Sequence, residues 1–288
     1  MEKINRKKPK SASRPLVSVI ISTRNEEDVL EVLLKSIEEQ SYKNVEIIVV
    51  DNFSTDKTTK IAKRFTDKVY KKGPERSVQR NYGAEKSEGE YVLILDADMQ
   101  LSKDVIKECV EAVTQKKKIA TVIVPEESIA SNYWEAVKAF ERSFYNLEGD
   151  KYTDAARFFD RKVFQEVGGY DENITGPEDW DLPERIKKNG YQGARVKSII
   201  YHFERIDGIF SVAKKKYYYA LRSNVYLKKH NISPVSPKTV YFLRPVFYKN
   251  YKHIISHPGL SFGMFIMLSL ELVFGAIGYF LGKLLFSS

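Results

Sequence analysis

Two acidic residues, Asp96 and Asp98, come directly after the apolar run Tyr91–Leu95. If the chain stays extended there, both side chains lie on the same side of it, because side chains alternate along a strand. Converging carboxylates repel each other unless a cation lies between them, and their oxygen atoms suit Mg²⁺ or Mn²⁺. Such an ion offsets the negative charge that a diphosphate gains as it leaves. Acidic pairs also cap turns after strands, so the motif alone is a weak signal.

Three polar clusters, this one included, follow predicted strands. Leu16–Ser22 and Val45–Asp51 are short, β-branched runs with the composition of buried parallel strands. In open parallel sheets, ligands bind at the carboxyl ends of the strands. The clusters found there are Thr23–Glu26, Asp51–Asp56 and Asp96–Asp98.

Helical patterns alternate with these strands. Apolar residues from Val29 to Ile37 recur at helical spacing, and Ser54 or Thr55 can cap a helix that runs to about Phe65. The alternation predicts an α/β fold with a mostly parallel sheet covered by helices on both faces. The later expected elements are a strand at Tyr91–Leu95, a helix at Val105–Val113, a strand at Ala120–Val124, a helix at Leu182–Lys188 and a strand at Val196–Tyr201.

The net charge of +9 is concentrated in the two ends of the chain. Residues 1–14 carry six basic side chains against one acid, and residues 208–288 carry eleven against one, which leaves residues 15–207 at −6. A nucleic-acid binder needs its cations on the folded core, so we expect no nucleic-acid partner. Basic flanks beside an apolar segment instead favour anionic lipid and the cytoplasmic side of a membrane. The single cysteine, Cys109, excludes an intrachain disulfide.

The C-terminal part of the chain predicts contact with a membrane. Residues 211–258 interleave Lys and Arg with Tyr and Phe, which suits helices at the interface with lipid headgroups. Gly259–Leu281 contains one charged residue, Glu271, and as a helix it extends about 34 Å, enough for a bilayer core. We expect one transmembrane helix within residues 259–285, with a re-entrant or monotopic hairpin as the alternative. Glu271 should then be protonated, partnered or facing protein.

Glycines recur in this apolar segment. Gly259 and Gly263, and again Gly278 and Gly282, are four residues apart. Such pairs let another helix approach closely, although glycine is also simply common in transmembrane helices.

Six motifs follow one another along the chain. They are Ser22–Glu26, Val50–Asp56, Arg80-Asn81-x-Gly83, Asp96-Ala97-Asp98, Gly168–Glu172 and Glu178-Asp179-Trp180. The phosphate-binding motifs of dinucleotide and P-loop proteins do not occur. With the six motifs in this order, over roughly residues 15–230, the chain resembles the family 2 glycosyltransferases of GT-A fold. The resemblance implies a GT-A catalytic domain at 15–210, and we expect residues 1–14 to be a flexible basic tail.

The resemblance also implies a donor site for a nucleotide-diphosphate sugar. Thr23, Asn25 and Glu26 would line the nucleotide pocket, and Asp51 would accept hydrogen bonds from the base. Arg80 would contact the diphosphate or order the Asp-x-Asp loop. The simpler alternatives are a turn residue for Asp51 and a surface charge for Arg80.

A divalent metal, Mg²⁺ or Mn²⁺, belongs to the same implied site. Asp98 would bind the metal directly, and Asp96 would contact the ribose or the metal. His202, at the end of a late strand, is a candidate third ligand, because many GT-A enzymes complete the metal site with a histidine there. A structural histidine is the alternative.

Asp179 is the candidate general base, with Glu178 and Trp180 on the acceptor side. An inverting transfer needs a carboxylate that removes the proton of the acceptor hydroxyl. An acid at a helix N-terminus is also favoured by the helix dipole, so position alone does not separate the two readings. Trp180 could offer an apolar face to an acceptor sugar or be a buried core residue.

These residues predict an inverting transfer of a hexose to a hydroxyl of a lipid-linked saccharide or glycolipid. A phosphate acceptor is already an anion and needs little help from a base, so a catalytic Asp179 favours a hydroxyl. The expected place is the cell membrane, with the catalytic domain cytoplasmic. The alternatives are a polyprenyl- or dolichyl-phosphate sugar synthase and a catalytically silent nucleotide-binding scaffold. The Gln-x-x-Arg-Trp motif of processive family members does not follow, which favours one transfer per acceptor.

Overall fold

The computed structural model describes residues 14–116, 118–146, 149–150 and 154–285. Its main sheet has seven strands in the order β3-β2-β1-β4-β8-β6-β9, and β8 alone runs antiparallel to its two neighbours. This confirms the predicted, mostly parallel sheet. The strands are β1 (Val17–Thr23), β2 (Val45–Asp51), β3 (Val69–Lys71), β4 (Tyr91–Asp96), β6 (Ile119–Ile123), β8 (Phe158–Asp160) and β9 (Gln192–Arg195).

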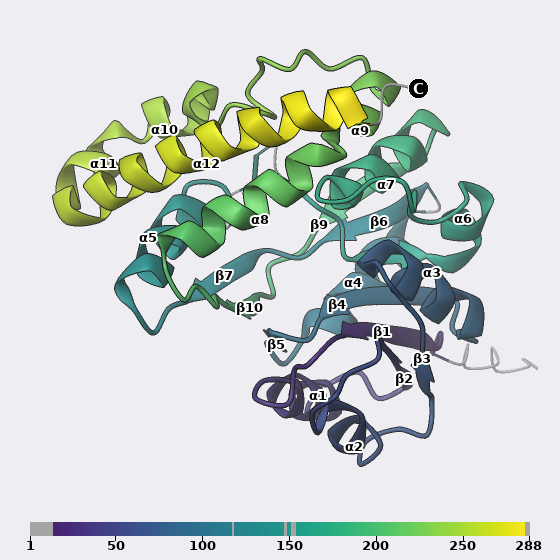
Figure 1. Ribbon diagram of the computed structural model, residues 1–288. Helices are drawn as coiled ribbons and strands as arrows, with labels where there is room; N and C mark the ends of the chain where they lie inside the picture. The colour runs from purple at the N-terminus through teal and green to yellow at the C-terminus, as the bar shows by residue number, and fades with distance from the viewer. Residues whose placement is uncertain (1–13, 117, 147–148, 151–153, 286–288) are drawn as a thin grey trace, which may run out of the picture.

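Helices cover both faces of this sheet, as Figure 1 shows. Side chains of alternate strand residues enter two separate apolar clusters, because successive residues of a strand point to opposite faces. One face packs against α1 (Leu30–Glu38), α2 (Thr58–Ala62) and α4 (Val105–Gln115). The other face packs against α3 (Arg76–Lys86), α6 (Arg161–Glu166) and α7 (Glu178–Lys188).

A smaller sheet stands beside the carboxyl ends of the main strands. It has the order β5-β10-β7 and consists of β5 (Met99–Leu101), β7 (Glu126–Ile129) and β10 (Ile200–Phe203). The chain turns at Ala97 and Asp98, between β4 and β5. The prediction that Asp96 and Asp98 share one extended segment is therefore wrong, because β4 ends at Asp96.

Other elements also differ from the prediction. Neither Ser54 nor Thr55 caps a helix: α2 begins only at Thr58, and Ser54 bonds to Asp51 instead. The short strands β3, β5, β7, β8 and β9 were not predicted, because two to four pairing residues leave little periodic signal. The region 211–258, expected as interface helices, forms α8 (Ile209–Leu221), α9 (Ser223–Lys229), the 3₁₀ turn η1 (Tyr241–Leu243), α10 (Pro245–Lys249) and α11 (Tyr251–Ser256). Except for Arg14, the predicted basic tail lies outside the described residues.

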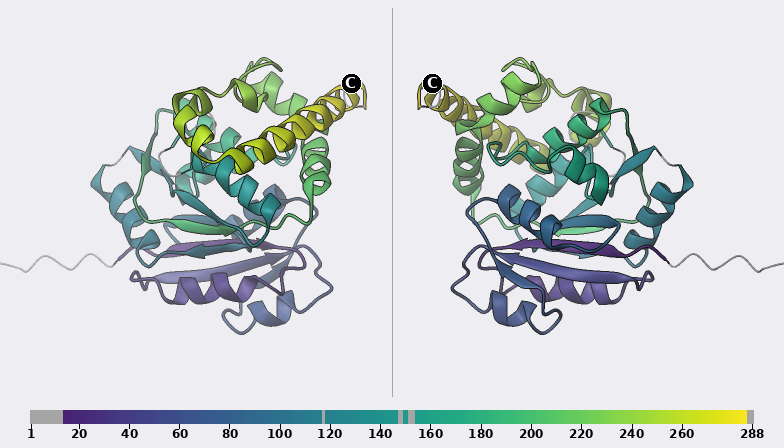
Figure 2. Two further views of the ribbon diagram at one scale, coloured as in Figure 1. Left: turned by 90° about the vertical axis from the view of Figure 1, so that its left-hand side faces the viewer. Right: turned by 90° about the vertical axis from the view of Figure 1, so that its right-hand side faces the viewer.

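A single helix, α12 (Pro258–Leu285), holds the predicted apolar segment. Among the described residues it is the one helix long and apolar enough to cross a membrane, judged by length and composition. It runs along α8 and over α5 (Tyr133–Ser143), as the views in Figures 1 and 2 agree. Glu271 of α12 is buried and lies 3.2 Å from Lys138 Nζ of α5. The expectation that Glu271 is partnered is confirmed.

The glycine of the Arg80-Asn81-x-Gly83 motif has a packing role that can be tested. A Cβ atom at Gly83 would lie 2.4 Å from Ile20 Cγ2, because α3 rests directly on β1. We predict that Gly83→Ala lowers the free energy of unfolding by about 1–3 kcal/mol through overpacking. Denaturant unfolding of the variant and the parent measures this difference in free energy. Gly259→Ala, where a Cβ meets nothing within 4 Å, is the control and should cause no loss.

Candidate active site

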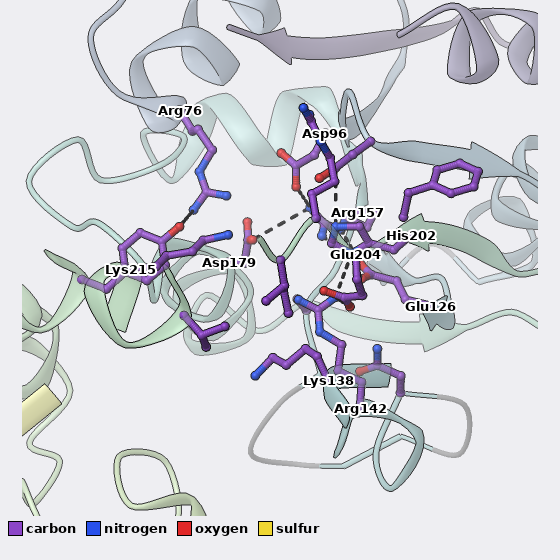
Figure 3. A pocket seen from close by; sticks show the side chains of 18 of the residues that line it. Arg76, Asp96, Glu126, Lys138, Arg142, Arg157, Asp179, His202, Glu204 and Lys215 are labelled. Atoms are coloured by element: carbon purple, nitrogen blue, oxygen red, sulfur yellow. Dashed lines mark hydrogen bonds and ion pairs between the residues drawn. The ribbon is translucent and has the colours of Figure 1, made fainter. Parts of the chain in front are cut away.

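A cavity of about 620 Å³ opens at the carboxyl ends of β1 and β4 and extends to α5, α8 and α12. Figure 3 shows the side chains that converge on it from these separate elements. Of the predicted site residues, seven line it: Thr23, Glu26, Asp96, Asp98, Asp179, Trp180 and His202. Four do not: Asn25, Asp51, Arg80 and Glu178.

Asn25 and Asp51 hold a loop together beside the cavity. Asp51 is fully buried and accepts hydrogen bonds from Ser54 N at 2.9 Å and from Thr23 Oγ1 at 3.2 Å. Asn25 has φ 54° and accepts from Thr55 N at 2.9 Å. These contacts match the turn role that was the alternative for Asp51. They fix the loop after β1, from which Thr23 and Glu26 reach the cavity.

Two buried arginines, Arg80 and Arg157, organise the centre of the site. Arg80 Nη2 lies 2.8 Å from Asp96 Oδ1, and Arg157 Nη1 lies 3.3 Å from Asp96 Oδ2. Burial opposes ionisation of Asp96, but the two guanidinium groups outweigh it and hold the pKa of Asp96 well below its usual range. Since Arg80 is fully buried, the alternative of a surface charge is excluded. Both oxygens of Asp96 already contact an arginine, so a metal at Asp96 would have to share an oxygen with a guanidinium.

The same two arginines hold Asp179. Its Oδ1 accepts a hydrogen bond from Arg80 Nη1 at 2.7 Å. Its Oδ2 lies 3.9 Å from Arg157 Nη1, which is too long for a hydrogen bond. One oxygen is thus fixed while the carboxylate faces the cavity. The arrangement suits a positioned proton acceptor.

Glu178 lies behind Arg80 and Arg157, the two arginines that we call the arginine frame. Its side chain is buried, and its Oε1 lies 2.9 Å from Arg76 Nη2 and 3.9 Å from Arg80 Nη1. Arg76 lines the cavity, and it also donates to the Tyr219 hydroxyl at 3.3 Å. Glu178 therefore acts on the cavity by positioning arginines.

Asp98 and His202 form the part of the site that can hold a cation. His202 Nε2 lies 3.5 Å from Asp98 Oδ1, while Nδ1 lies 2.8 Å from Arg142 Nη1 and 3.4 Å from Glu126 Oε2. Arg142 can only donate to Nδ1, so a cation at Nε2 requires Arg142 to move and leave Nδ1 to Glu126, which is a common supporting contact behind a metal-binding histidine. Among the described residues, no three His, Cys, Asp or Glu side chains form a closed metal site. The pair instead fits an ion such as Mg²⁺, which keeps part of its shell for substrate phosphates and water.

The charge state of His202 follows from its neighbours. Burial and Arg142 disfavour the protonated ring, but Asp98 and Glu126 outweigh them and raise the pKa of His202 to about 9. A cation that binds Nε2 must displace a proton.

Sequence reasoning missed several charged residues of the cavity: Glu126, Lys138, Arg142, Arg157, Glu204 and Glu271. One signal was available for Arg157, which interrupts the apolar run from Ala155 to Phe159, where a charge needs a partner. Arg157 bonds to Glu126 at 3.0 Å and, with His202, keeps the pKa of Glu126 well below its usual range in spite of burial. Arg142, on α5, reaches Glu204 at 3.0 Å.

Comparison with known proteins decides the family. A model described as glycosyl transferase family 2 matches residues 18–168, and one described as the N-terminal domain of galactosyltransferase matches residues 135–208. The chain belongs to glycosyltransferase family 2. An uncharacterised glycosyltransferase of Rickettsia typhi is 28% identical to this family 2 chain over 210 residues, which cover 66% of the chain and 62% of the relative.

A second relative of this glycosyltransferase carries a functional name. The GalNAc(5)-diNAcBac-PP-undecaprenol beta-1,3-glucosyltransferase of Campylobacter jejuni is 37% identical over 97 residues, which cover 30% of the chain and 31% of the relative. The matches to the first relatives thus span from about a third to under two thirds of their lengths.

A solved structure confirms the GT-A-like fold. The mannosyltransferase PcManGT of Pyrobaculum calidifontis, in complex with GDP-Man and Mn²⁺, aligns with a TM-score of 0.59 at 18% identity. The alignment covers 89% of this chain and 74% of that chain.

The arginine frame predicts a large stability effect. Arg157→Gln leaves the partly buried carboxylates of Asp96 and Glu126 with too little positive charge, so we expect a loss of about 2–3 kcal/mol in the free energy of unfolding, below the range for a fully buried pair. Arg64→Gln removes an exposed pair with Glu31 and should cost no more than about 1 kcal/mol. Denaturant unfolding of both variants at neutral pH measures the difference, and equal losses would contradict the frame.

Proposed function

We propose that this chain is an inverting hexosyltransferase that uses a nucleotide-diphosphate sugar as donor. The acceptor is a hydroxyl of a lipid-linked saccharide or glycolipid at the cytoplasmic membrane face. The observation that carries the proposal is that two acidic residues of one cavity, Asp98 and Asp179, have different partners. Asp98 faces His202, while Asp179 is held by arginines and presents a carboxylate oxygen without a hydrogen-bonded arginine.

The donor end of the cavity lies at the loop after β1 and the turn after β4. Thr23 and Glu26 reach it, and Asn25 and Asp51 keep that loop in place. Asp98 and His202 would hold Mg²⁺ or Mn²⁺, which supplies positive charge to the departing nucleotide diphosphate. The GDP-Man and Mn²⁺ found together in PcManGT support a metal of this kind.

Asp179 is the proposed base. The acceptor hydroxyl loses its proton to Asp179 Oδ2 as its oxygen forms a bond to the anomeric carbon. The bond from that carbon to the diphosphate oxygen breaks, and its electron pair leaves with the nucleotide. Arg80 keeps the carboxylate in one orientation throughout. Trp180, which lines the cavity beside Asp179, would face the acceptor sugar.

The far end of the cavity supports a lipid-linked acceptor. Its lining includes four cations, Lys138, Lys215, Lys216 and Arg244, together with Tyr241. Arg244 Nη2 is buried with no hydrogen-bond partner, although the guanidinium lies 3.5 Å from the centre of the Tyr241 ring. Cations beneath the apolar helix α12 suit a phosphate that joins a sugar to a lipid. The relative from Campylobacter, named for an undecaprenol-diphosphate substrate, is consistent with this class.

The metal site predicts how the donor binds. Thermal unfolding of the full-length protein with a panel of nucleotide sugars and Mn²⁺ should find a donor that raises the Tm, by mass action on the native state. Asp98→Asn should lose the metal-dependent part of that rise. Asp67→Asn, an exposed acid far from the cavity, should keep it. Equal Mn²⁺-dependent rises in Asp98→Asn and the parent would rule out this site.

If Asp179 is the base, its loss should slow transfer to a hydroxyl acceptor more than transfer to a phosphate acceptor. Asp179→Asn should slow transfer to a lipid-linked saccharide by about 10²–10⁴-fold, the usual contribution of a general base, while donor affinity changes little. A polyprenyl-phosphate sugar synthase is the second candidate, because the cations at the far end also suit a bare phosphate acceptor. Transfer to polyprenyl phosphate by Asp179→Asn at the parental rate would favour that candidate.

A further inference from the structure

Helix α12 is long enough to cross a bilayer, so its contacts decide how it meets the membrane. Its 28 residues extend about 42 Å at 1.5 Å per residue. A spanning helix needs lipid around most of its length. A helix in the interface plane needs one apolar side toward lipid and another side toward protein.

One side of α12 forms a seam with the catalytic part of the chain, with glycines toward its two ends and the buried residues Met264, Met267, Leu268 and Glu271 between them. A Cβ atom at Gly263 would lie 2.6 Å from Val137 of α5. At Gly278 it would lie 2.4 Å from the backbone oxygen of Tyr217, and at Gly282 it would overlap the backbone of Leu221 in α8. This seam covers about 28 Å of the helix, so the glycines pack α12 against its own protein.

An ion pair fixes the middle of the same side. Glu271 is 5% exposed, lines the cavity, and lies 3.2 Å from Lys138 Nζ. Lys138 also contacts Glu141 at 3.0 Å within α5. Separating Glu271 from Lys138 would leave the buried Glu271 carboxylate without its positive partner, which is costly. Glu271 thus joins α12 to the wall of the active-site cavity.

The opposite side of α12 is apolar and exposed. Its exposed residues include Phe262 and Phe265 and, after a gap of two turns, Val273, Ile277, Phe280 and Leu284, with 46–80% of each residue accessible. At one end of α12, the neighbouring helices α10 and α11 add exposed Tyr248, Tyr251 and Ile255. Lys249 and Lys252 beside them are also exposed, which suits anionic lipid headgroups.

A spanning orientation conflicts with the seam. If α12 crossed the bilayer with its contacts intact, α8 would enter the hydrocarbon with it, and α8 carries the consecutive residues Lys214, Lys215 and Lys216. Each lysine at the bilayer centre costs a few kcal/mol. Leaving α8 behind would break the seam and the Glu271–Lys138 pair.

We propose that α12 lies in the interface plane of one leaflet and forms the roof of the active site. Its phenylalanine side enters the acyl region of a phospholipid bilayer, and its glycine side stays on α8 and α5. The protein is then monotopic, in place of the single-pass arrangement expected from the sequence. The far end of the cavity, with Lys215 and Lys216, opens directly beneath the membrane surface.

Site-directed labelling separates the two orientations. Cys109 is the only cysteine and is buried, so Cys109→Ser gives a background for single cysteines in the full-length protein. Lys60→Cys marks the catalytic part, and Gly259→Cys and Lys283→Cys mark the two ends of α12. In sealed vesicles, a membrane-impermeant maleimide should label all three from the same side. Labelling of Lys283→Cys from the side opposite to Lys60→Cys would overturn the proposal.

Depth measurement gives an independent readout. Nitroxide labels at Phe265→Cys and Phe280→Cys, probed by electron paramagnetic resonance in anionic vesicles, should lie at equal and shallow depths. In a spanning helix these positions differ by about 22 Å along the membrane normal. Unequal depths would contradict the proposal, as would a protein that stays off the vesicles and forms a dimer through α12.

Discussion

The site depends on two arginines that are buried among carboxylates. Arg80, on α3, and Arg157, just before β8, bring together Asp96 at the end of β4 and Asp179 at the start of α7. Each carboxylate alone would be costly to bury, and each arginine alone would be as costly. Together they make it favourable for four distant segments to meet at one edge of the sheet. Removing any one charge leaves the others unbalanced.

This frame separates the acids of the cavity by role. Asp96 is held on both oxygens, Asp179 on one, and Asp98 by neither arginine. Asp98 instead faces His202 across the junction between the main sheet and the smaller one. The proposed cation site and the proposed base thereby lie at different places on one cavity. An inverting transfer requires this, since the leaving group and the attacking oxygen lie on opposite sides of the anomeric carbon.

Much of the fold could be predicted from the sequence, because its long elements carry strong periodic signals. Val45–Asp51 forms β2 with the predicted bounds, and α1 follows the predicted apolar spacing. The short strands could not be predicted, since pairing with distant segments defines them. The same limit applied to the site. Asp98 and Asp179 come from recognisable motifs and His202 from its place in a late strand, and all three reach the cavity. Arg157 and Glu126 are instead drawn in by long-range ion pairs that no local pattern encodes.

The C-terminal helix shows how composition and packing can point to different orientations. Its apolar run and its length predict a transmembrane span, yet its glycines and Glu271 contact α5 and α8. With α12 as the proposed roof, the cavity would have its proposed nucleotide end toward water and its proposed acceptor end beside lipid. Such an arrangement would let a lipid-linked substrate reach Asp179 without leaving the membrane.

The most direct test of the central claim is a crystal structure of the full-length protein with its nucleotide-sugar donor and Mn²⁺. We expect an anomalous manganese peak in contact with Asp98, His202 and the diphosphate, with Asp96 still bound to Arg80 and Arg157. Asp179 should stand across the anomeric carbon from the diphosphate. A metal held away from Asp98, or Asp179 on the same side as the leaving group, would contradict it.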